Sequence, residues 1–258
     1  MVLACKVLVE TFKHYLKTIA SFGIGRSVTK FTFKSVMTQN LSAQTKQIFL
    51  VVNDDEGNLA KTSQVLKGKY PQVEIVTAQD AQSAQSQVER YYPYLVILDL
   101  SLADKPYSIP NPEVGIQLLK TLMLINSAPN IAVLSINIKS LVRVKHQINS
   151  YKSGFAAMDK ISTKEMLKAV DFALSGSNYL PPIVRSSPEF DPKWIEMLNL
   201  KFEQGFTDQA IAQRMGVTAR TICNYWLKLQ DVLGIYDEPE KDLKIQIGIA
   251  ARKIGLIS

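Results

Sequence analysis

The chain has 258 residues, a hydrophobic fraction of 47% and a net charge of +7, which suit one large or two modest globular domains. Only two cysteines occur, Cys5 and Cys223, and no CxxC pair or Cys/His cluster accompanies them, which excludes a disulfide scaffold and a structural zinc site. A run of about 18 apolar residues is also missing, so we expect no transmembrane helix, no membrane partner and a reducing, cytoplasmic location.

The excess positive charge lies mainly at the N-terminus. Residues 1–37 carry six Lys/Arg and one acid, a net charge of +5, whereas residues 177–258 carry ten of each. We expect residues 1–45 to be a basic extension that precedes the folded part. Two interpretations stay open: a surface-seeking amphipathic helix, or a non-native start with Met37 as the true first residue. The second is favoured because Met37 stands just ahead of a polar lead-in and the first strand.

From residue 48 onward, short apolar runs alternate with helical periods. This alternation favours a parallel sheet with helices on both faces, because each strand is followed by a crossover helix. We therefore predict that residues 46–175 form an α/β domain, a doubly wound five-stranded parallel sheet of the flavodoxin-like type. The predicted strands are 48–52, 73–77, 95–98, 131–134 and 155–158, and the predicted helices are 59–69, 80–91, 114–124, 140–150 and 163–174.

The pattern changes after this domain. Residues 176–192 are rich in Ser, Pro and Gly, which predicts a linker, since the prolines disfavour a continuous helix. No strand pattern follows, and residues 193–258 are predicted to form an all-α domain. Its four predicted helices are 194–203, 208–214, 219–233 and 242–253.

Polar residues stand at the carboxyl ends of the predicted strands, where doubly wound sheets bind their ligands. Asn53 and Asp54 follow the first strand, Asp99 the third, Ser135 the fourth and Lys160 the fifth. The chemistry that this set suggests is phosphoryl transfer to a carboxylate, with Asp99 as the acceptor. Lys160 would hold phosphoryl oxygens and Ser135 would donate a hydroxyl hydrogen bond. Oxygens of Asn53, Asp54 and Asp99 would bind Mg²⁺.

Four stretches resemble, in order and spacing, the signature blocks of two-component receiver domains. The resemblance covers residues 46–175 and implies phosphorylation of Asp99 by a sensor histidine kinase. Three features depart from the family pattern: Asn53 replaces the first of two acids, the loop from Asp99 to Gly115 is longer, and Ala157 replaces the aromatic that normally moves with the hydroxyl residue. A pseudo-receiver that dimerises or binds a protein without phosphorylation therefore stays open. The four stretches are FLVVNDDE (49–56), VILDL (96–100), VLSIN (133–137) and MDKIS (158–162).

The helical region carries a second signal. A short helix, a turn at Gly216 and a longer helix capped by Thr218 are typical of a helix-turn-helix. Ile222 and Trp226 would be buried, with Trp226 interpreted as plain core packing, while Arg220 and Asn224 lie on another face. Residues 203–235 and the ending IAARKIGLIS resemble the LuxR-type output domain of NarL/FixJ response regulators. This resemblance implies that the following residues contact DNA phosphates or bases, or border that contact: Thr207, Thr218, Arg220, Thr221, Cys223, Asn224 and Lys228.

Together these patterns predict a DNA-binding transcriptional response regulator that acts as a homodimer and is controlled by phosphorylation of Asp99. The alternative is a protein-interaction module built on a pseudo-receiver. An enzyme such as an aspartyl-phosphate phosphatase is not favoured, because no further catalytic set is visible beside the acids.

Overall fold

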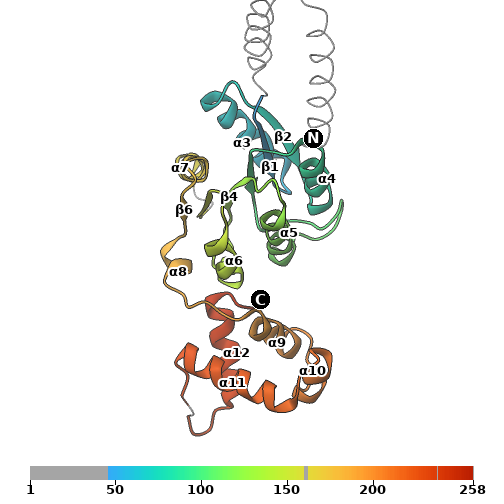
Figure 1. Cartoon of the computed structure of the whole chain (residues 1–258), viewed down its shortest axis with the longest axis vertical. Coiled ribbons are helices and arrows are strands. Elements are labelled where there is room, and N and C mark those ends of the chain that lie inside the picture. The colour runs from blue at the N-terminus through green and yellow to red at the C-terminus, as the bar shows by residue number, and fades with distance from the viewer. Residues whose placement is uncertain (1–45, 160–161, 237, 258) are drawn as a thin grey trace, which may run out of the picture. The chain divides into compact units, whose positions relative to one another are not determined.

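The computed structural model describes residues 46–159, 162–236 and 238–257 (Figure 1). Contacts divide the chain after Thr45, and Lys46–Ser258 forms one compact unit. The basic extension with Cys5 and Met37, and the predicted phosphoryl-binding Lys160, lie outside the described residues. Within the described residues, no helix has both the length and the apolar character needed to span a bilayer.

A parallel sheet forms the first part of the unit (Figure 1). Its strands lie in the order β2-β1-β3-β4-β5-β6, and the first five follow the flavodoxin-like order 2-1-3-4-5. The prediction of five strands was one too few, because the two-residue β6 pairs with β5 at the edge of the sheet. The strands are β1 (Ile48–Val52), β2 (Glu74–Ala78), β3 (Leu95–Leu98), β4 (Asn130–Leu134), β5 (Phe155–Met158) and β6 (Asn178–Tyr179).

Helices cover both faces of this sheet, since alternate strand residues enter two separate buried clusters. Val51 belongs to the cluster that holds the apolar residues of α3 and α7, and Val52 to the cluster that holds those of α4 and α5. The predicted helix 140–150 is instead a 3₁₀ turn, η1, followed by a short α6. The elements are α3 (Glu56–Lys69), α4 (Ala81–Tyr91), α5 (Pro112–Leu124), η1 (Ile138–Val144), α6 (Lys145–Ser150) and α7 (Thr163–Leu174).

The segment 176–192, predicted to be a linker from its composition, is structured in part. It contains β6 and the one-turn helix α8 (Pro182–Arg185). Leu180, Val184 and Phe190 are buried, so apolar residues between the prolines anchor the segment.

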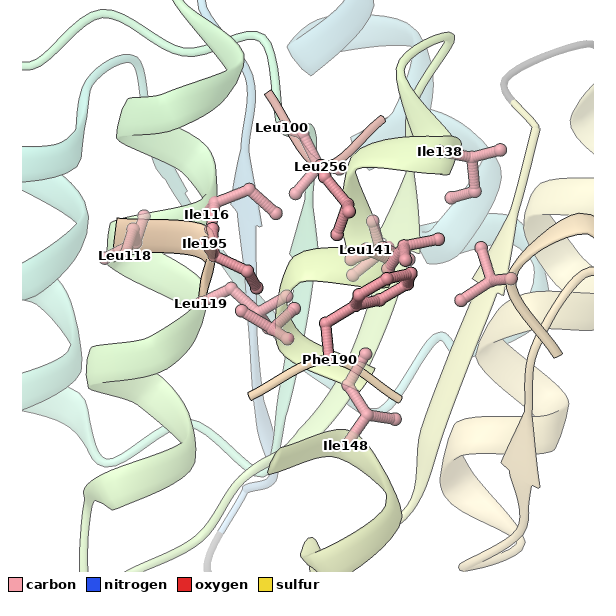
Figure 2. Close-up of a cluster of buried hydrophobic side chains, with 14 of the residues drawn as sticks. Leu100, Ile116, Leu118, Leu119, Ile138, Leu141, Ile148, Phe190, Ile195 and Leu256 are labelled. Atoms are coloured by element: carbon pink, nitrogen blue, oxygen red, sulfur yellow. The ribbon is translucent and has the colours of Figure 1, made fainter. Parts of the chain in front are cut away.

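Four helices follow: α9 (Pro192–Phe202), α10 (Asp208–Arg214), α11 (Ala219–Leu233) and α12 (Leu243–Ile254). The predicted bounds of α10 and α11 agree with the structure, because the side chains of Thr207 and Thr218 cap the first turns of these two helices. One hydrophobic cluster joins this region to the sheet-containing part. Figure 2 draws Ile195 and Leu256 of the helical region among Leu119 and Leu141.

Candidate functional site

Asn53 and Asp99 meet where the strand order reverses. β1 and β3 are neighbours whose register pairs Val52 with Leu98, so the residues that follow them lie side by side. Both side chains are buried, with 6% of each residue exposed, and Asn53 Nδ2 donates to Asp99 Oδ2 at 3.1 Å. The structure thus brings together two of the predicted site residues at the carboxyl edge of the sheet.

Asn53 uses both ends of its side-chain amide in hydrogen bonds within the protein. The amide N–H of Asn53 points at Asp99, and Asn53 Oδ1 accepts the backbone N–H of Asp55 at 3.0 Å, so neither end of the amide offers a ligand toward Asp99. Asp54 is exposed, and Asp55 caps α3 by accepting the N–H of Asn58. The described part of the chain forms no group of three or more His, Cys, Asp or Glu side chains that could hold a metal ion.

A chain of hydrogen bonds connects Asp99 with Ser135. Asp99 Oδ1 accepts the backbone N–H of Ser101 at 3.1 Å, and Ser101 Oγ accepts Asn137 Nδ2 at 2.9 Å. The backbone N–H of Asn137 donates to Ser135 Oγ at 3.2 Å, and Ser135 is fully buried. We call these hydrogen-bonded residues the strand-end cluster: Asn53, Asp99, Ser101, Ser135 and Asn137. Sequence reasoning missed Ser101 and Asn137, although Asn137 closes the VLSIN stretch that pointed to Ser135.

The long loop between β3 and α5 is restrained at its base. Leu102 forms a bridge with Asn111, and Ala103 forms one with Asp80, which caps α4. These backbone bridges restrain the loop, which the sequence showed to be longer than the family pattern. The tip is open to solvent, with a fully exposed Tyr107 at a φ of 67°. Ala157 is buried in β5, so that position offers no aromatic to the strand-end cluster.

The predicted DNA-contacting residues gather on α10 and α11. Gly216, at a φ of 64°, turns the chain between the two helices. Thr207 and Thr218 cap α10 and α11. Their hydroxyl oxygens accept the backbone N–H groups of Ala210 and Thr221, respectively. Thr221 is half-buried, and its hydroxyl lies 2.9 Å from that of Thr218. We define the reading face as the four exposed residues of α11 among the predicted contacts: Arg220, Cys223, Asn224 and Lys228.

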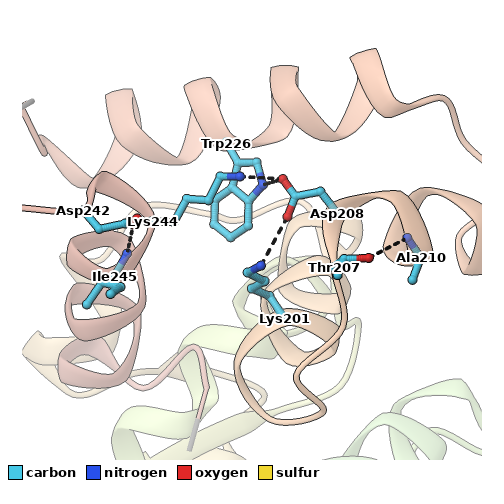
Figure 3. Close-up of polar contacts among 8 residues, drawn as sticks. All are labelled: Lys201, Thr207, Asp208, Ala210, Trp226, Asp242, Lys244 and Ile245. Atoms are coloured by element: carbon cyan, nitrogen blue, oxygen red, sulfur yellow. Dashed lines mark hydrogen bonds and ion pairs between the residues drawn. The ribbon is translucent and has the colours of Figure 1, made fainter.

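Asp208 holds α11 to the other helices (Figure 3). Its Oδ2 accepts Trp226 Nε1 at 3.1 Å and Lys244 Nζ at 2.6 Å, and its Oδ1 lies 3.5 Å from Lys201 Nζ. Burial acts to raise the pKa of the Asp208 carboxyl, but Lys244, Lys201 and Trp226 together hold that pKa below its ordinary value. Trp226 therefore packs in the core, as interpreted from the sequence, and also donates a hydrogen bond that the sequence did not reveal.

No protein-family model matches the chain, and no curated protein matches it. The chain resembles several solved structures. One is RcsB from Salmonella enterica serovar Typhimurium bound to promoter rprA in the presence of phosphomimetic BeF3-. The two chains share 19% sequence identity, the match covers 80% of this chain and 99% of that chain, and the TM-score is 0.49. Two RcsB dimers bound to two parallel DNAs give 18% identity, 81% and 98% coverage and a TM-score of 0.49. The response regulator ChrA of a heme-sensing two-component system gives 18% identity, 82% and 99% coverage and a TM-score of 0.38.

Proposed function

We propose that the chain is a DNA-binding transcriptional response regulator of the NarL/FixJ type. The observation that carries this proposal is the reading face of α11, where Arg220, Cys223, Asn224 and Lys228 are exposed on a helix anchored by Asp208. A helix that follows a short helix and a tight turn fits the DNA major groove, which presents a distinct pattern for each base pair. The helix-turn-helix assignment of residues 193–258 is part of this proposal.

Two copies acting together are also part of the proposal. Residues 177–258 carry ten Lys/Arg and ten acids, so one copy neutralises few phosphates and binds DNA weakly. A homodimer on a two-fold site would add the affinity of two reading faces, with half-site spacing set by the symmetry of the protein. We expect such a dimer to act in the cytoplasm, where DNA and a sensor histidine kinase are both accessible.

The reading face is tested by alanine variants. Arg220→Ala and Asn224→Ala should each weaken specific binding by about 1–3 kcal/mol and relax preference at one base position, if each contacts a base edge. Lys228→Ala should weaken all sequences alike and lower the salt slope by about one unit, as a phosphate contact does. The measurement is fluorescence anisotropy with a panel of DNA fragments at several salt concentrations.

Lys241→Ala is the matched control, because it removes one exposed positive charge that lies outside α11 and pairs with Glu238. It should leave base preference unchanged. Parent protein that ignores DNA at low salt, or Arg220→Ala and Asn224→Ala proteins that bind as the parent does, would refute the DNA-reading role and favour a protein-interaction module.

We also propose that phosphorylation of Asp99 regulates the protein. Mg²⁺ would be the cofactor and a sensor histidine kinase the phosphoryl donor. The support for this regulation is the burial of Asp99 at the carboxyl edge of the sheet, hydrogen-bonded through Ser101 and Asn137 toward Ser135. The second candidate, a pseudo-receiver that needs no phosphoryl group, is favoured by one observation. The amide of Asn53 donates to Asp99 from the position where a cation would need a ligand.

Asn53→Asp distinguishes the two candidates. It replaces the amide donor with a second carboxylate, and two adjacent carboxylates repel each other unless a cation lies between them. We expect this variant to gain Mg²⁺ affinity, seen as a rise in melting temperature of about 2–4 °C per kcal/mol of binding free energy. It should also gain phosphoryl mass faster than the parent in acetyl phosphate and Mg²⁺, whereas Asp99→Asn should gain none.

Intact mass and Mg²⁺ affinity together distinguish the possible results. A parent that gains no mass while Asn53→Asp does would identify the chain as a pseudo-receiver. Unchanged incorporation in Asp99→Asn would show that the acceptor is another residue. An Asn53→Asp variant with no gain in Mg²⁺ affinity would show that Asn53 does not border the metal position.

A further inference from the structure

An open cavity of about 640 Å³ lies between the C-terminal parts of α5 and α6, among residues to which the proposed function assigns no role. It is lined by side chains from residues 120–128, which end α5 and lead toward β4, and from residues 146–152. We call it the α5–α6 cavity. Cavities of roughly 300–1,000 Å³ with a mostly apolar lining and a few polar groups are typical of sites for small organic molecules.

One wall of the cavity is apolar. Met123, Ile125 and Tyr151 line it, are half-buried and pack against the hydrophobic core. Leu124 also lines the cavity, yet 83% of this residue is exposed. Full burial of an apolar side chain is worth about 1.5–3 kcal/mol, so contact between Leu124 and an apolar ligand would stabilise a complex.

Hydrogen bonds hold this wall in place without a ligand. The Tyr151 hydroxyl donates to the backbone oxygen of Pro129, and Ser153 Oγ donates to that of Ala128 at 2.6 Å. Ala128 has a φ of 30°, which a residue with a side chain keeps only where its surroundings impose it. Burial raises the pKa of Tyr151 to about 12, so its hydroxyl adds no negative charge at neutral pH. The wall is therefore preformed, which lowers the entropic cost of binding.

The charged side chains that line the cavity are all basic: Lys120, His146 and Lys152. His146 already faces an acid, with its Nδ1 3.1 Å from Glu189 Oε2. Within the described residues, the side chains of Lys120 and Lys152 have no ion-pair or hydrogen-bond partner. The ends of α5 and α6 each contribute at most about half a negative charge, against two full positive charges on the lysines. The cavity therefore favours an anionic group next to its apolar wall.

We propose that the α5–α6 cavity binds a carboxylate with an apolar tail, the chemistry of a medium-chain fatty acid. Lys120 and Lys152 attract the carboxylate, and the tail covers Met123, Leu124 and Tyr151. A stable protein partner would bury about 800 Å² on each side, whereas one small amphipathic molecule needs only the cavity. This binding requires neither phosphorylation nor DNA, so its failure would leave the proposed function untouched.

Calorimetric titration of the full-length protein with decanoate, below the concentration at which decanoate forms micelles, tests the proposal. Decanoate should bind saturably. Acetate, which has the charge without the tail, should give no measurable binding. Decanol, which has the tail without the charge, and decyltrimethylammonium, which has the opposite charge, should bind about tenfold more weakly than decanoate, because hydrogen bonds to charged groups are the stronger ones.

The role of the lysines is tested by the double variant Lys120→Gln/Lys152→Gln. It should weaken decanoate binding about tenfold and leave decanol binding unchanged, since it removes the positive charges and keeps the apolar wall. Lys105→Gln/Lys168→Gln is the matched control, because it removes two exposed lysines that do not line the cavity. This control should bind decanoate as the parent does.

The role of the apolar wall is tested by Leu124→Asn, a change at an exposed position that should leave the melting temperature unchanged. It should weaken decanoate and decanol alike, severalfold, because both lose the same apolar contact. Leu227→Asn, the same change at an exposed leucine of α11, should have no effect on either ligand.

A decanoate analogue with a photoreactive diazirine in its tail locates the site. Mass spectrometry of the labelled protein should find the label within residues 120–128 or 146–152. The proposal is overturned if decanoate does not bind saturably, if the label lies elsewhere, if decyltrimethylammonium binds as well as decanoate, or if either cavity variant behaves as its control. Decanoate affinity that falls as the protein concentration rises, and does not in Leu124→Asn, would assign the cavity to a second copy of the chain and also overturn it.

Discussion

Gly115→Ala is expected to destabilise the protein by about 3 kcal/mol or more, the upper end of the cost of overpacking. A Cβ at Gly115 would lie 2.1 Å from the backbone oxygen of Leu100 and 2.5 Å from its Cα. Both are backbone atoms that cannot rotate away, so α5 or the β3–α5 loop would have to move. For a unit of this size the melting temperature should fall by about 2–4 °C per kcal/mol, measured by thermal unfolding.

Gly68→Ala is the control for this prediction. Gly68 is exposed within α3, and a Cβ there would meet no atom within 4 Å. Alanine should therefore stabilise the helix by about 0.5–1 kcal/mol. Equal stability of Gly115→Ala and the parent would contradict the close packing of α5 on Leu100, which follows Asp99 in the chain.

Asp208→Ala is the second change with a large expected effect, a loss of about 3 kcal/mol of unfolding free energy. The substitution leaves the indole N–H of the buried Trp226 without its acceptor and removes the partner shared by Lys244 and Lys201. Asp208→Asn keeps a side-chain acceptor for Trp226 and should cost less. Chemical denaturation of the full chain measures both.

The contribution of Asp208 to the free energy of unfolding should depend on pH. Because the folded-state pKa of Asp208 is lowered, its contribution is present above the ordinary carboxyl pKa and is lost as the pH falls through the lower folded-state value. The difference in stability between parent and Asp208→Asn should therefore shrink in acid. Asp231→Asn, an exposed aspartate of α11, should stay within about 0.5 kcal/mol of the parent throughout.

Strand bounds were predictable where the burial pattern is simple. β1, β3 and β5 lie at the predicted positions, because parallel strands buried on both faces have continuous apolar runs. η1 was predicted as α-helix, since buried residues three and four apart occur in both helix types. β6 was not predicted, because Asn178 and Tyr179 carry no strand pattern and pair only through their backbone with β5.

The candidate site was predictable in position but not in bonding. The strand ends predicted that Asn53 and Asp99 would lie together, and they do. An asparagine can ligate through its oxygen or donate through its nitrogen, and its neighbours in space decide which. Arg143 and Lys145 were missed for a related reason, since their acceptors at Gly255 and Arg185 are backbone groups far along the chain that no side-chain pattern reveals.

The hydrophobic cluster shared by the two parts has a consequence for their modularity. Phe190, Ile195 and Leu256 are buried together with apolar residues of α5, η1 and α6. If the helical region were separated at this boundary, these side chains would face water. The same would happen if it were joined to another sheet domain that lacks a matching surface. We therefore expect the sheet and the four C-terminal helices to unfold as one cooperative unit, in a single calorimetric transition rather than two.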